Sequence, residues 1–156
     1  MQQYGKTILT AYPLLSGYVT QIENLIRKRA RNSFYLRVDT VSFAEQLLRL
    51  GEIRKDLLEL KITIEETLAS IPEYDRILIS YKYFGIMPKD ENFDLKSRNY
   101  FRKQIKALER FSNALVQSGY DSEWFKNKYL KIAFISGIYQ RTLLEEGKKH
   151  VRENFS

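Results

Sequence analysis

Apolar side chains recur every three or four residues between Ser42 and Ala69, and this periodicity restricts the fold of the chain more than any other feature. The series consists of Phe43, Leu47, Leu50, Ile53, Leu57, Leu60 and Ile64. Such spacing places these residues on one side of an α-helix and approximates a heptad seam over about three repeats. Ser42 and Glu45 stand in capping-box register at its start.

The long helix predicted here needs a partner for its apolar side. That partner is either the helix expected for residues 15–31, folded back antiparallel, or the same helix of a second subunit, and both remain open. Further apolar residues widen the stripe beyond a two-helix seam, namely Leu48, Leu58, Ile62 and Leu68. The width favours a small helical bundle and leaves room for a homodimer through residues 42–69.

Few residues that break helices interrupt the chain, since its 156 residues include only three prolines and seven glycines. The predicted fold class is therefore all-α. Residues 4–12 are expected to form a short helix that Pro13 ends or kinks before the helix at residues 15–31. An extended connection is expected at residues 34–39.

A last helical segment is expected after Gly119. Asp121 or Ser122 can cap a helix that carries Trp124, whose indole is expected to anchor the core rather than to stack on nucleic acid. The helix is either interrupted at residues 136–137, Ser-Gly, or continuous to about residue 149.

The net charge of +7 is concentrated in two segments. Residues 27–37 carry five positive charges, residues 96–110 carry six against one acid, and the rest of the chain sums to −3. This distribution favours an extended polyanion as partner, although an anionic membrane surface or an acidic protein would also fit it. The first cluster, a secondary basic patch, follows a predicted helix end, where cations also suit the helix dipole. It consists of Arg27, Lys28, Arg29 and Arg31.

The second basic segment lies on a helix predicted for residues 97–115, with Ser97 as its N-cap. One face is expected to be buried and carries Phe101, Ile105, Leu108, Phe111 and Leu115. The opposite face is cationic and carries Arg98, Arg102, Lys106 and Arg110, with Asn99 and Lys103 beside them. Such a helix can enter a DNA major groove, where arginine matches guanine, asparagine matches adenine and lysine neutralises phosphate. An ordinary solvated basic face would give the same pattern.

Residues 71–85, IPEYDRILISYKYFG, resemble the opening helix of sigma-70 region 4. The segment SRNYFRKQIKALERF resembles the recognition helix of that region. Its sequence is most similar to the sigma-like late-gene regulators of the ArpU type found in phages of Firmicutes. The resemblance implies a helix-turn-helix module, double-stranded DNA as partner, and a regulator of transcription of phage or mobile-element origin. It also implies that Ser97, Arg98, Asn99, Arg102, Lys103 and Lys106 face DNA, and Arg110 extends the same cationic face.

The segment between the two helices departs from the family pattern. Sigma-like modules place a short scaffold helix there, whereas residues 86–96, IMPKDENFDLK, contain a proline and a polar run that permit at most one distorted turn. Either the helix-turn-helix is retained with a shortened first part, or the architecture survives without DNA binding. The second alternative makes the chain a helical interaction protein that binds another protein, such as RNA polymerase.

Residues that catalysis or metal binding would need are scarce. The chain has no cysteine and one histidine, at position 150, and it contains neither a glycine-rich phosphate loop nor a nucleophile elbow. We therefore expect no enzymatic activity, no catalytic residues, no cofactor and no metal. No apolar run approaches the roughly 20 residues that span a bilayer, so a cytoplasmic protein without membrane contact is expected.

The expected organisation has three parts. Residues 1–70 form an N-terminal helical hairpin or bundle, residues 71–120 the sigma-region-4-like module, and residues 121–156 C-terminal helices that pack on the rest.

Overall fold

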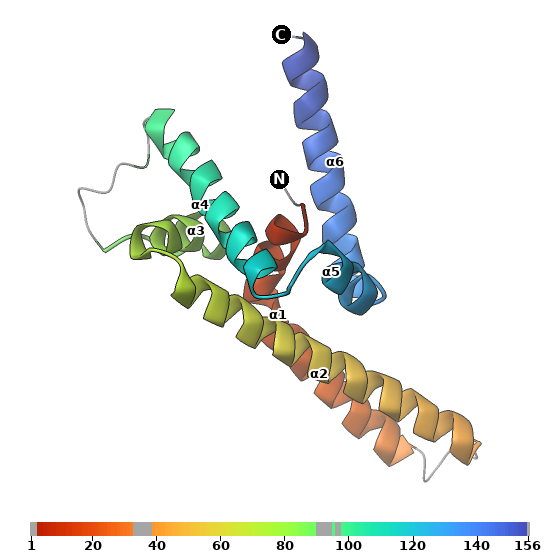
Figure 1. Ribbon diagram of the computed structural model, residues 1–156. Helices are drawn as coiled ribbons and strands as arrows, with labels where there is room; N and C mark the ends of the chain where they lie inside the picture. The colour runs from red at the N-terminus through yellow and green to blue at the C-terminus, as the bar shows by residue number, and fades with distance from the viewer. Residues whose placement is uncertain (1–2, 33–38, 90–94, 96–97, 156) are drawn as a thin grey trace.

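The computed structural model describes residues 3–32, 39–89, 95 and 98–155, and this part of the chain is built from six α-helices (Figure 1). The helices are α1 (Gln3–Asn32), α2 (Thr40–Ser70), α3 (Glu73–Phe84), α4 (Arg98–Gln117), α5 (Ser122–Tyr129) and α6 (Ala133–Phe155). The all-α prediction is confirmed. The extended connection expected at residues 34–39 lies almost wholly outside the described residues.

Helices α1 and α2 form a long antiparallel hairpin that extends away from the rest of the molecule (Figure 1). Three contacts fix their register: Arg29 Nη1 donates to Gln46 Oε1 at 3.1 Å, Arg54 Nε to Glu23 Oε1 at 2.8 Å, and Tyr12 Oη to Glu65 Oε1 at 3.0 Å. The partner of the periodic face of α2 is therefore α1 of the same chain. Along that face, burial deepens from half-buried Phe43 to fully buried Leu57, Leu60 and Ile64.

The ends of the hairpin helices differ from the sequence prediction in two places. Helix α1 continues through Pro13. The proline is exposed, whereas Leu9 and Leu15, which precede and follow it in the sequence, are buried. The expected capping box at Ser42 is wrong, because α2 begins earlier. Asp39 is the N-cap and its carboxylate accepts a hydrogen bond from the backbone N–H of Val41, as short acidic side chains do at helix starts.

Helices α3 and α4 also run antiparallel along their contact. Asp75 meets Arg110, Leu78 meets Gln104, and the ring of Tyr81 lies 6.1 Å from that of Tyr100. Helix α3 ends at Gly85, the last residue of the segment that resembles the opening helix of sigma-70 region 4, with a left-handed backbone (φ 68°) that suits a residue without a side chain. Pro72 occupies the N-cap of α3.

Helix α5 has the predicted Asp121 cap, whose carboxylate accepts from the Trp124 N–H at 2.9 Å. The interruption before α6 falls at residues 130–132 rather than at 136–137, and α6 runs on through Ser136 and Gly137. Trp124 is half-buried against Tyr120 and Tyr129, in agreement with an anchoring role.

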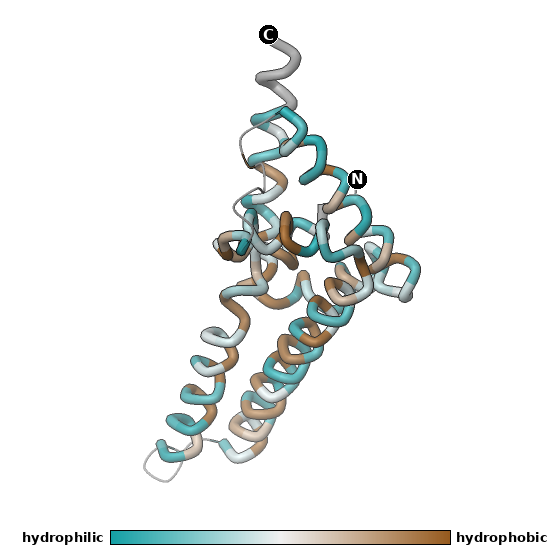
Figure 2. Tube along the Cα trace, turned by 90° about the vertical axis from the view of Figure 1, so that its left-hand side faces the viewer, coloured by the Kyte–Doolittle hydropathy of each residue, from teal (hydrophilic) through white to brown (hydrophobic). Residues whose placement is uncertain are grey.

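Helix α1 is central to the core, because it contacts α2, α3, α4 and α6. The buried cluster takes residues from all six helices, from Tyr4 in α1 to Ile138 in α6. The hydropathy of the chain follows this arrangement, with hydrophobic and hydrophilic residues alternating along both hairpin helices (Figure 2). Within the described residues, no helix combines the length and the apolar character that crossing a membrane requires.

Candidate nucleic-acid interface

The C-terminal half of α4 is anchored in the core, whereas its beginning projects from the molecule (Figure 1). Leu108, Phe111 and Leu115 are buried and hold the helix in place. On the opposite side of the first three turns, Arg98, Asn99, Arg102 and Lys106 are all exposed. None of these three cations forms an ion pair with a described residue.

The expected buried face of α4 is wrong in its first half. Phe101 and Ile105 are 66% and 47% exposed, because the face of α3 against this half of α4 takes up Tyr100 and Gln104 instead. Gln104 is buried, and its amide donates to the carbonyl oxygen of Leu78 at 2.6 Å and to Tyr100 Oη at 3.1 Å. A buried polar group that is hydrogen-bonded in this way is tolerated. Because Gln104 is polar, the spacing of apolar residues could not predict its burial.

Two of the candidate DNA-binding residues contact α3. The guanidinium of Arg110 donates through Nη1 to both oxygens of Asp75 at 2.8 Å, and the Asp75 side chain is almost fully buried. Lys103 places its ammonium 5.3 Å from the centre of the Tyr74 ring, a cation–π distance. Arg110 and Lys103 therefore lie on the α3 side of the helix, whereas Ser97 lies outside the described residues.

The exposed face that remains is compact. Arg98, Arg102 and Lys106 follow one another at intervals of four, so their Cα atoms span about 12 Å along the helix axis. Asn99 lies beside them, and exposed Phe101 and Ile105 border them on one flank. This combination of cations, an amide and apolar groups defines what we call the α4 face: Arg98, Asn99, Phe101, Arg102, Ile105 and Lys106.

The secondary basic patch lies at the other end of the molecule, where α1 ends at the tip of the hairpin (Figure 1). Arg27, Lys28 and Arg31 are exposed, whereas Arg29 is half-buried and bonded to Gln46. The described cations of this patch and those of the α4 face do not form one continuous surface.

A third group of lysines, which the sequence did not indicate, joins α1, α3 and α6. Burial and the neighbouring charges of Lys82 and Lys149 lower the pKa of Lys6, and burial together with Lys149 lowers the pKa of Lys82. The Lys6 ammonium pairs with Glu146, and Glu145 lies near enough to act on it electrostatically. The acids offset the lysines, so this group is a mixed contact between helices and not a free cationic surface.

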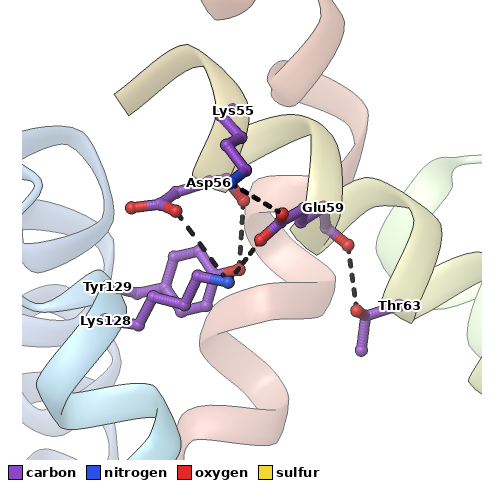
Figure 3. Close-up of polar contacts among 6 residues, drawn as sticks. All are labelled: Lys55, Asp56, Glu59, Thr63, Lys128 and Tyr129. Carbon is purple, nitrogen blue, oxygen red and sulfur yellow. Dashed lines mark hydrogen bonds and ion pairs between the residues drawn. The ribbon is translucent and has the colours of Figure 1, made fainter. Parts of the chain in front are cut away.

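The polar cluster between α2 and α5 has the same structural character (Figure 3). Lys128 pairs with Glu59 and lies 3.8 Å from Asp56 Oδ1, while Tyr129 Oη donates to the Asp56 carbonyl at 3.0 Å. The hydrogen bond and charge of Lys128 lower the pKa of Glu59, whereas burial raises that of Tyr129. Each group is thus satisfied by the others, and no set of residues suited to a metal ion occurs in the described part of the chain.

A surface groove of about 720 Å³ lies along α3 and the segment that follows it. Its walls combine apolar residues, among them Ile77 and Pro88, with the charged side chains of Glu73 and Arg76. Ile86 and Met87 are well exposed at this groove.

Comparisons of this chain with protein-family models, with curated proteins and with solved structures found no match.

Proposed function

We propose that this protein is a DNA-binding regulator of transcription that inserts the α4 face into the major groove of double-stranded DNA. The observation that carries the proposal is the projecting start of α4, whose exposed cations have no ion-pair partner among the described residues. Its opposite side is fixed by Leu108, Phe111 and Leu115. A rigid helix with a free cationic face is what the major groove admits.

The residues of the α4 face are suited to contact different parts of the DNA. Arg98 and Arg102 supply guanidinium groups that fit the O6 and N7 acceptors of guanine, and Asn99 supplies the amide that fits adenine. Lys106 neutralises phosphate. Phe101, exposed on the flank, is suited to contact with thymine methyl groups. This last role gives a reason for an aromatic ring that the core leaves uncovered.

The test is a triple charge reversal, Arg98→Glu, Arg102→Glu and Lys106→Glu, measured by fluorescence anisotropy with duplex DNA at several salt concentrations. We expect affinity to fall roughly 100-fold at moderate salt. The slope of log affinity against log salt should decrease by about 1, because Lys106 is the one phosphate contact among the three residues. Each lost phosphate contact removes close to one released counterion, which accounts for the slope.

The matched control reverses three exposed lysines elsewhere, Lys126→Glu, Lys131→Glu and Lys148→Glu, and thus changes the net charge equally. It should keep most of the affinity. Equal losses in both variants would show that only the overall charge matters, and the absence of any salt-sensitive binding by the unaltered protein would refute the proposal. Circular dichroism verifies that each variant remains helical.

A second candidate function is docking on another protein, for which the resemblance to sigma-like modules suggests RNA polymerase. The specific observation in its favour is the groove along α3 with Ile86 and Met87 exposed beside it. Under this alternative the triple variant of α4 retains full function, while Met87→Glu abolishes it.

A further inference from the structure

Helix α2 carries a second set of apolar side chains, which are exposed and lie outside its buried face. Val41, Leu48 and Ile62 are 64%, 68% and 54% exposed. They are separated by seven or fourteen residues, so they lie on one side of the helix. The core-facing series ends on a different side, at Leu57, Leu60 and Ile64. Helix α2 thus carries exposed apolar side chains beside the face that packs on α1. Toward its end this second set adjoins other helices, because Glu65 accepts from Tyr12 of α1 and Ile62 lies at a hollow shared with Trp124.

The second set forms a stripe that follows a heptad repeat. Val41, Leu48, Lys55 and Ile62 occupy one repeating position, and Ala44, Gly51, Leu58 and Glu65 occupy the position three residues later. Together they correspond to the two inward positions of a coiled coil. A sustained period of seven fits a second helix of the same period rather than a flat surface.

Charged residues border the stripe asymmetrically. One border carries acids at every heptad, at Glu45, Glu52, Glu59 and Glu66, and the other carries Arg54 and Lys61. In a parallel pair of helices the two borders meet each other, so acids face bases. In an antiparallel pair each border meets its own copy, which places acids against acids.

We propose that two copies of this chain associate through the outer stripe of α2 as a parallel, in-register pair. Leu48 then contacts Leu48 of the partner subunit, and Lys61 pairs with Glu66 of the partner subunit. Neither Lys61 nor Glu66 has an ion-pair partner among the described residues, whereas Arg54 is bound to Glu23 and Glu59 to Lys128 within one chain. The inference stands apart from DNA binding, because it involves no residue of the α4 face.

Lys55 sets a limit on the strength of this pair. Lys55 is exposed, and its Nζ lies 4.0 Å from Glu59 Oε1. In the proposed dimer it would face Lys55 of the partner subunit. A lysine at one inward position weakens a coiled coil but fixes its register. We therefore expect a dimer that dissociates on dilution, and a tighter one in Lys55→Leu.

The absence of native cysteine allows a direct test of orientation. Leu48→Cys should form a disulfide-linked dimer under mild oxidation, whereas Gln21→Cys, at an exposed position of α1, should not. If instead a mixture of Leu48→Cys and Ile62→Cys links only to each other, the pair is antiparallel and the proposal is overturned. The proposal would also be overturned if the protein at high concentration sedimented as a single species with the mass of one chain.

Charge exchange gives the second test, without cysteine. Lys61→Glu should raise the dimer dissociation constant about 10-fold, and adding Glu66→Lys should restore it. Leu48→Arg should raise it more than about 100-fold while the helical content stays unchanged, because position 48 is exposed in the single chain. Failure of Glu66→Lys to rescue Lys61→Glu would contradict the parallel pairing.

Discussion

At the scale of single residues, a close contact between α1 and α4 depends on the missing side chain of Gly5. A Cβ atom at this position would lie 2.7 Å from Ser112 Oγ. That hydroxyl oxygen is buried without a hydrogen-bond partner among the described residues. Gly5→Ala should therefore lower the free energy of unfolding by about 1–3 kcal/mol through overpacking, as measured by urea denaturation.

The double variant Gly5→Ala with Ser112→Ala distinguishes crowding from a loss of backbone freedom. Ser112→Ala removes the clashing oxygen, and the remaining neighbours of a Cβ at position 5 then lie at 3.9 Å. In that background Gly5→Ala should be neutral or stabilising by up to about 1 kcal/mol, since alanine favours a helix over glycine. An equal cost in both backgrounds would contradict the crowding explanation.

At the scale of helices, the sequence predicted what local signals determine. The three-and-four periodicity identified α2 and α4, and Asp121 marked a helix start because its side chain bonds to the backbone only three residues later. Which face of a helix is covered depends on neighbours far along the chain. The apolar pattern therefore predicted a buried Phe101, which is exposed, and gave no sign that Gln104 is buried. Gln104 is bonded to Leu78, which lies in another helix.

The contact of α3 with α4 was equally invisible in the sequence, because Asp75 and Arg110 are 35 residues apart. Arg110→Met leaves a buried carboxylate without its partner and should cost about 1–3 kcal/mol of stability, a range reduced because the arginine itself is half exposed. Asp75→Asn removes the buried charge and should cost less, and the double variant less than the sum of both. Urea denaturation of the four proteins measures these differences.

The same variant defines the edge of the proposed interface. Since Asp75 already holds the Arg110 guanidinium, Arg110→Met with its fold intact should change DNA affinity less than about 3-fold. A loss comparable to that of the α4 triple variant would instead assign Arg110 to DNA.

At the scale of the whole molecule, the end of α1 at the hairpin tip and the start of α4 lie at opposite ends (Figure 1). The 31 residues of α2 make this helix about 46 Å long at 1.5 Å per residue, and the hairpin tip lies at its start, away from the buried residues of its second half. If the α4 face binds DNA, the tip lies away from that duplex. The cations Arg27, Lys28 and Arg31 then serve α1 itself, because positive charge at a helix C-terminus is favourable.

Reversing these three charges to glutamate should consequently lower the stability of the protein by about 1 kcal/mol or more, while DNA affinity changes less than about 5-fold. Thermal unfolding and anisotropy at one salt concentration measure both effects. The variant carries the same net charge as the triple variant of α4, so a difference in affinity between the two reports position alone. If the tip variant loses binding as fully as the α4 variant, the duplex is held by the field of the entire chain, and α4 has no special role.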